Sequence, residues 1–142
     1  VQRWLWDDHA AAVRRERPEL DDDALAAVVG AFVARPVADP DCPPPHRTGG
    51  AVDVTLCDAA SGEELDLGSP FDAPVAAAAT RHLERPGADP DARRHRRLLF
   101  HAMTGAGFAN YHAEWWHYDF GNQRWANVVG ADAARYGIPG DE

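Results

Sequence analysis

Two short segments of this 142-residue chain carry the residue types that metal-dependent hydrolysis requires. The first segment contains His46 and, on the far side of a pair of glycines, Asp53. The second contains Glu114 and His117 with two tryptophans between them. Two neutral imidazoles and one carboxylate are a typical ligand set for a catalytic zinc ion, because they leave the fourth tetrahedral position open. A glutamate beside such a site is the residue type that takes the proton of a metal-activated water.

These two segments resemble the signature motifs of the D-alanyl-D-alanine dipeptidases, the VanX-like branch of a zinc peptidase superfamily. The HxxGxAxD motif of that family is complete in residues 46–53, and its Glu-Trp-Trp-His motif is complete in residues 114–117. Residues 68–72 are similar to the family's G-[ST]-x-F-D segment, and residues 97–111 are similar to its RxLL, M and GF..Y run. The resemblance therefore extends over most of the chain.

The resemblance implies a mechanism in which one Zn²⁺ per chain is bound by His46, Asp53 and His117. Glu114 would act as the general base and would then deliver the proton to the leaving amine. The implied reaction is the hydrolysis of the D-Ala-D-Ala dipeptide to D-alanine by a metal-activated water.

The resemblance also implies a small-molecule binding site. Asp72 matches the family's aspartate that helps hold the free ammonium of the dipeptide. Trp115 and Trp116 would form the wall of the substrate pocket, where they would exclude bulk water and strengthen the electrostatic interactions at the metal.

Two other functions fit the same residues. One is a D,D-carboxypeptidase that acts on peptidoglycan stem peptides; Asp72 favours the dipeptidase, because a stem peptide has no free amine at that position. The other is a zinc-binding domain without catalytic activity, against which the intact Glu114 argues.

The chain departs from the family pattern at two places. The family usually has a serine two residues before the first zinc-binding histidine, where this chain has Pro44, so one hydrogen bond to the dipeptide would be missing. The family also has an arginine in a YRP segment just upstream of the Val-Gln pair with which this sequence opens, and that arginine helps stabilise the tetrahedral intermediate. We expect either a fragment without the N-terminal segment, or an impaired protein, since losing one such donor costs about 10²- to 10³-fold in rate.

Composition excludes several classes of function. The length predicts one domain over residues 1–142, and the net charge of −9 argues against a nucleic-acid or anionic-membrane partner. We find no apolar run of about 18 residues and no signal-peptide pattern, which predicts a cytoplasmic protein, or a periplasmic or secreted one if the start is processed.

Cys42 and Cys57 flank the first motif, and both a disulfide and two free thiols fit the sequence.

Hydrophobic spacing predicts the elements that position the site. Helices are expected over residues 1–17, 21–35, about 74–83 and 92–106, and strands over residues 50–57 and 123–129. The four arginines of the 92–106 segment are expected to be largely solvated, while Leu98 and Leu99 would face the core and Gly107 would end the helix. A turn is expected over residues 59–68.

The second motif is ambiguous, because Glu114 and His117 share a face only in a helix. Its many aromatic residues favour extended structure, so we expect Glu114 on a turn that leads into a strand near Trp116. Gly121 and Asn122 would then connect this strand to the strand at residues 123–129 as a hairpin. The family resemblance implies a single compact α+β domain, with helices packed on a small antiparallel sheet that carries the zinc site.

Overall fold

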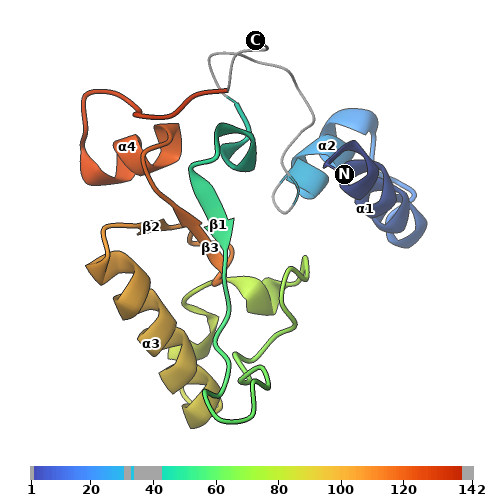
Figure 1. Cartoon of the computed structure of the whole chain (residues 1–142). Coiled ribbons are helices and arrows are strands. Elements are labelled where there is room, and N and C mark those ends of the chain that lie inside the picture. The colour runs from blue at the N-terminus through green and yellow to red at the C-terminus, as the bar shows by residue number, and fades with distance from the viewer. Residues whose placement is uncertain (1, 31–32, 34–42, 139–142) are drawn as a thin grey trace. The chain divides into compact units, whose positions relative to one another are not determined.

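The structure is a computed structural model that describes residues 2–30, 33 and 43–138 (Figure 1). Its contacts divide the chain into two compact units, residues 1–44 and residues 45–142. The second unit combines helices with a small antiparallel sheet, which confirms the predicted α+β class. The expectation of one dipeptidase-like domain over residues 1–142 stays a prediction.

The first unit is a pair of packed helices, α1 (Gln2–Glu16) and α2 (Asp22–Gly30). Their interface buries Val13, Leu25 and Val29. The side chain of Asp21 accepts a hydrogen bond from the backbone N–H of Ala24 at 2.8 Å and so caps the start of α2. Both predicted helices are therefore confirmed as far as residue 30; the rest of the second lies mainly outside the described residues, as does Cys42.

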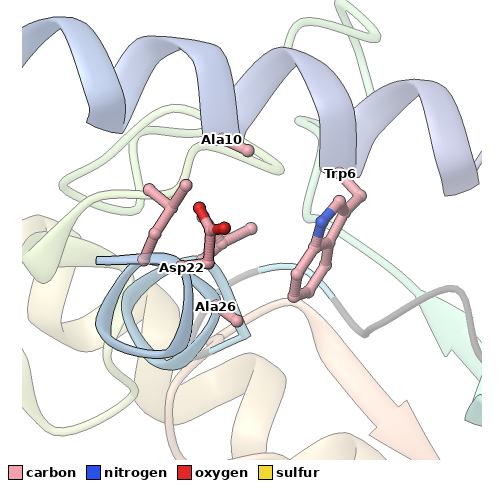
Figure 2. Close-up of a pocket in the computed structure, with 6 residues that line it drawn as sticks. Trp6, Ala10, Asp22 and Ala26 are labelled. Atoms are coloured by element: carbon pink, nitrogen blue, oxygen red, sulfur yellow. The ribbon is translucent and has the colours of Figure 1, made fainter. Parts of the chain in front are cut away.

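A small pocket of about 190 Å³ lies between the two helices of this unit (Figure 2). Its lining is mostly apolar, and its one charged residue, Asp22, already pairs with Arg14 at 2.5 Å. Apart from Asp22, the lining residues of this pocket are not types that bind a metal ion or transfer a proton.

The second unit is built around a sheet that has three strands within the described residues: β1 (Ala51–Asp53), β2 (Ala109–Asn110) and β3 (His117–Asp119). Strand β3 lies in the middle and pairs antiparallel with both neighbours. Glu114 precedes it on a turn, as predicted. The 3₁₀ helix η1 (Pro45–Thr48) leads into β1, and α3 (Pro90–Gly105) and α4 (Gln123–Val129) both contact β2 (Figure 1).

The predicted strand over residues 50–57 is shorter in the structure. Regular pairing ends at Asp53, although the N–H of Val54 still donates to Trp116 O at 3.0 Å. Beyond it, Cys57 forms an isolated antiparallel bridge to Glu64, and the predicted turn lies between them, held by the side chain of Asp58. Cys57 is an exposed free thiol.

The predicted helix over residues 74–83 is wrong. The segment forms two short 3₁₀ helices, η2 (Ala76–Ala78) and η3 (His82–Glu84). Its backbone groups bond outside the segment: Ala77 O and Ala79 O accept from the Arg96 guanidinium, and Thr80 N–H donates to His112 O. These external bonds replace the i to i−4 bonds of an α-helix.

Helix α3 confirms the predicted helix over residues 92–106. It ends at Gly105 with Ala106 as its C-cap, and Gly107 follows with a φ of +92°. Asp89 caps the start of α3 by accepting from Ala92 N–H at 2.8 Å. Two side-chain placements were predicted wrongly: Arg96 is buried, whereas Leu98 is 57% exposed. Burial of Arg96 is possible because its guanidinium donates to Leu67 O, Ala77 O, Ala79 O and Ser69 Oγ.

The predicted strand and hairpin at residues 121–129 are also wrong, because residues 123–129 form helix α4. The side chain of Asn122 accepts from Trp125 N–H at 2.9 Å as an N-cap. Gly130 follows the helix with a φ of +70°, the left-handed conformation that glycine favours at a helix end. The Gly-Asn pair therefore starts a helix here, although the same pair is also typical of hairpin turns.

The core of the second unit is formed by the Trp-Trp pair of the second motif. Trp115 and Trp116 are almost fully buried and pack with Leu67, Leu99 and Tyr118. Because the motif itself supplies the largest core side chains, the residues on either side of it are held by the packing of the whole unit.

Replacement of Arg96 by Met should lower the free energy of unfolding by at least about 2 kcal/mol, because three backbone carbonyls would lose a buried donor. The exposed Arg94→Met on the same helix is the matched control and should change stability by no more than about 0.5 kcal/mol. Urea unfolding of both variants measures the difference. Equal stabilities would show that the Arg96 contacts contribute nothing net.

Candidate metal centre

The two sequence motifs meet where β1 pairs with β3. Asp53, the last residue of β1, lies directly opposite His117, the first residue of β3. Directly opposed residues of an antiparallel pair have neighbouring side chains, so this register brings the carboxylate to the imidazole. Helix η1 then places His46 beside both.

The approach of η1 to the sheet depends on Gly50. A Cβ atom at this position would lie 2.7 Å from Phe120 O and 3.1 Å from the Cβ of Asn122. Glycine therefore lets Gly50 O accept from Phe120 N–H at 2.7 Å and extends the β1 and β3 pairing. The Thr48 hydroxyl bridges the turn, since it accepts from Gly50 N–H and donates to Pro45 O.

The three candidate ligand groups form a small triangle, in which each histidine faces a different oxygen of Asp53. His46 Nε2 lies 3.1 Å from His117 Nδ1 and 3.3 Å from Asp53 Oδ2, and His117 Nδ1 lies 3.1 Å from Asp53 Oδ1. Ligands bound to one tetrahedral zinc at 2.0–2.1 Å are about 3.3 Å apart, so these spacings fit an ion shared by all three. The structure thus brings the predicted ligands His46, Asp53 and His117 together.

The charges of this cluster favour a metal ligand at Asp53. Partial burial acts to raise the pKa of Asp53, but hydrogen bonds from His117 and His46 outweigh it and hold the pKa well below its usual range. Asp53 therefore stays a carboxylate, the form that binds a cation.

A buried carboxylate fixes the orientation of His117. Asp119 Oδ1 accepts a hydrogen bond from His117 Nε2 at 3.1 Å, and the Asp119 side chain is fully buried. With Nε2 occupied, the other ring nitrogen, Nδ1, faces Asp53 and His46. Such carboxylate-histidine pairs are the usual support of metal-binding imidazoles, since they select the tautomer and raise the basicity of the ligand.

Glu114 lies next to the triangle without being part of it. Its Oε2 is 3.7 Å from His117 Nδ1, and its side chain is 17% exposed. Burial raises the pKa of Glu114 to about 7, helped by the charge of Asp53 and opposed by those of His117 and Arg124. A carboxylate with this pKa can both accept and return a proton near neutral pH.

Asp72 lies close enough to the site for its charge to interact with those of Asp53 and His46. Burial and the neighbouring Asp53 raise the pKa of Asp72 above its usual value. Its backbone has a φ of +55°, an unusual conformation that aspartate tolerates better than most residues. The preceding Phe71 packs its ring on Trp115 and Trp116, which ties the Asp72 segment to the second motif.

Trp115 and Trp116 are buried among core side chains, and Trp115 Nε1 donates to Ser69 Oγ at 2.9 Å. Phe71, which covers them, is 40% exposed. The tryptophans are thus placed as a wall behind the segment of residues 69–72, and their contact with a substrate stays a prediction.

Asp119 and Asn122 belong to the site but were not predicted from the sequence. His117 and Asp119 are two residues apart on one strand and therefore point to the same face, a spacing that could have identified the supporting carboxylate. Asn122 gave no such signal, because its role depends on the start of α4, which was predicted to be a strand.

The sequence of the chain is similar to those of known dipeptidases. A sequence model of the peptidase M15 family, described as D-ala-D-ala dipeptidase, matches residues 13–132. The chain belongs to this dipeptidase family. The family resemblance of the two motifs is therefore confirmed, and membership of this metallopeptidase family implies a metal at the His46, Asp53 and His117 cluster.

Curated relatives carry the same description. The chain is 37% identical over 101 residues to a D-alanyl-D-alanine dipeptidase of Synechocystis sp. The aligned region covers 66% of this chain and 40% of that protein. The chain is 40% identical over 74 residues to the D-alanyl-D-alanine dipeptidase of Escherichia coli, or 52% of this chain and 36% of the relative. The D-alanyl-D-alanine dipeptidase of Enterococcus faecalis is 34% identical over 73 residues, which are 51% of this chain and 35% of that relative. The matched region thus spans well under half the length of these dipeptidases.

Within the described residues, none of the helices combines the length and the apolar character needed to cross a bilayer.

The His117 ring should titrate far from its ordinary value in the metal-free protein. Although burial lowers the pKa of His117, hydrogen bonds to Asp119 and Asp53 outweigh it and raise the pKa to about 9. Because the folded value exceeds the unfolded value of about 6.5, the resulting stabilisation is complete below about pH 6.5 and is lost as pH rises through about 9. Ring ¹⁵N NMR against pH measures this directly. Asp119→Asn should lower the pKa, and a parent His117 that titrates near 6.5 would contradict the assignment.

Proposed function

We propose that this chain forms the zinc-binding catalytic centre of a D-alanyl-D-alanine dipeptidase. The observation that supports the proposal most is the position of Glu114, whose carboxylate lies 3.7 Å from a ligand atom of the His46, Asp53 and His117 triangle. A structural zinc site needs no carboxylate beside its ligands, whereas hydrolysis uses one as the general base.

The donor set favours zinc among the common metals. Two imidazole nitrogens and one carboxylate oxygen suit Zn²⁺, whereas Ca²⁺ and Mg²⁺ prefer ligand sets made only of oxygen. When bound, the ion would supply Lewis acidity that activates a water and polarises the scissile carbonyl. His46, Asp53 and His117 would hold it with one position left for the reactants.

Glu114 would move the proton in the reaction. Its carboxylate would accept a proton from the attacking water and return it to the leaving amine of the second D-alanine. In the metal-free protein burial raises the pKa of Glu114, so its affinity for a proton exceeds that of an ordinary glutamate. The hydrogen bond from Asn110 Nδ2 to Glu114 O, at 3.1 Å, would keep the turn that carries this carboxylate in place.

Asp72 would recognise the free ammonium of the dipeptide. Its carboxylate interacts with the charges at the metal cluster, which is where the amino end of so short a substrate would lie. The hydrogen bonds of Arg96 to Leu67 O, Ser69 Oγ and Ala77 O would hold the two ends of the segment that presents Asp72.

A cytoplasmic location is also part of the proposal, and it rests on the sequence alone.

Glu114→Gln should keep one equivalent of zinc and lose at least about 10²-fold in D-alanine release, because an amide cannot accept the water's proton. Metal analysis and a D-alanine assay on D-Ala-D-Ala, with parent and variant loaded alike, measure the two properties. His117→Ala is the companion control and should lose the tightly bound zinc. Unchanged turnover in Glu114→Gln would exclude Glu114 as the base.

N-Acetyl-D-Ala-D-Ala should be a poor substrate, because acylation removes the charge that Asp72 would bind. The lost charge-assisted hydrogen bond is worth about 1.5 to 3 kcal/mol, or about 10- to 150-fold in kcat/KM. Asp72→Asn should narrow the gap between the free and the acylated dipeptide. The measurement is kcat/KM for both substrates with both proteins.

Two results would replace the proposal. Equal kcat/KM on the free and acylated dipeptides in the parent would favour the D,D-carboxypeptidase. Zinc binding without hydrolysis of either substrate would favour a zinc domain that has no catalytic activity.

A further inference from the structure

Asn122 is a fully buried polar residue that the proposed reaction does not use. Its Nδ2 donates to Gly50 O at 2.9 Å and to Asp119 Oδ1 at 2.6 Å. Its Oδ1 accepts from Trp125 N–H at 2.9 Å. One short side chain therefore uses both of its amide donors and its acceptor in the interior of the unit.

The three partners of Asn122 belong to three different parts of the metal centre and its support. Gly50 lies between His46 and Asp53, the two ligands of the first motif. Asp119 orients His117, the ligand of the second motif. Trp125 lies in the first turn of α4, which Asn122 caps.

We propose that Asn122 is a positioning residue that holds the two ligand-bearing segments in register and fixes Asp119 against His117. The inference rests on the zinc site of the proposed function, but not on the identity of the substrate.

The hydrogen bonds of Asp119 explain why Asn122 is needed. Asp119 Oδ1 accepts two hydrogen bonds, one from Asn122 Nδ2 and one from His117 Nε2. Asp119 Oδ2 is buried and has no hydrogen-bond partner among the described residues; Arg124 Nε lies 3.8 Å away, too far for a hydrogen bond. Without Asn122, the carboxylate would keep one hydrogen bond and could rotate about its own axis. His117 would then lose the fixed partner that aims Nδ1 at the metal.

The variant Asn122→Ser separates this role from helix capping. Serine still caps α4 well but is too short to reach both Gly50 O and Asp119. The matched control is Asp89→Ala, which removes the N-cap of α3, a hydrogen bond of 2.8 Å from Ala92 N–H, on a helix that carries none of the three ligands. A purely structural role would make the two variants alike, because each loses polar contacts at the start of a helix.

The experiment measures zinc affinity by competition with a chromophoric chelator, together with the visible spectrum of the Co²⁺-substituted protein. Asn122→Ser should weaken zinc binding about 10- to 100-fold and change the Co²⁺ bands that report ligand geometry. Asp89→Ala should lower the melting temperature but leave zinc affinity within about twofold, as expected for a distant site. The double variant Asp119→Asn, Asn122→Ser should bind zinc more tightly than independent effects would give. The two fold-losses should multiply only if the residues acted separately, and both act through one contact.

Several results would overturn the inference. One is a folded Asn122→Ser protein with parental zinc affinity and Co²⁺ bands, and another is an equal loss of affinity in Asp89→Ala. If Asn122→Ser does not fold, Asp119→Asn alone tests the inference. Unchanged zinc affinity and Co²⁺ bands in Asp119→Asn would exclude the positioning of His117 through Asp119. A parent that binds no zinc would remove both this inference and the proposed function. A parent that binds zinc but does not cleave D-Ala-D-Ala would contradict only the function.

Discussion

The antiparallel pairing of β1 with β3 is the constraint on which the candidate site depends. The register that sets Asp53 opposite His117 joins a carboxylate and an imidazole from motifs far apart in the sequence. A shift of one residue would turn Asp53 or His117 to the other face of the sheet and separate them. The close contact of Gly50 with Phe120 and Asn122 favours this register, and the buried Trp-Trp pair anchors the residues that lead into β3.

The surroundings of two carboxylates in this small site shift their pKa values in opposite directions. Asp53 accepts hydrogen bonds from two histidines and stays ionised, whereas Glu114 lies in a more buried position without such donors and holds its proton more tightly. Divergent pKa values in neighbouring acids are a common way to divide roles between them. The division follows from strand pairing, since the pairing determines which carboxylate receives the imidazole donors.

Sequence predicted which residues lie together at the candidate site better than it predicted the elements around them, for physical reasons. His46, Asp53, His117 and Glu114 are identified by residue type and spacing, which chemistry restricts severely. The helix expected at residues 74–83 failed because Arg96, distant in sequence, takes the carbonyl groups of that segment. The strand expected at residues 123–129 failed because one asparagine can begin a helix or a hairpin, and only its contacts with Gly50 and Asp119 decide. Asp119 could be found from its spacing to His117, but Asn122 could not, since its partners are defined by tertiary structure.

The separation of the metal ligands along the chain also bears on how the protein folds. His46 and His117 are 71 residues apart, and their contact requires the pairing of β1 with β3, whereas α3 is a local element with its own cap. Long-range pairing carries a large loop-closure entropy, so the ligand triangle is absent from any state in which only local helices have formed. A metal ion can therefore stabilise the native state by mass action, but it cannot act as an early template for the chain. Metal should slow unfolding more than it speeds folding.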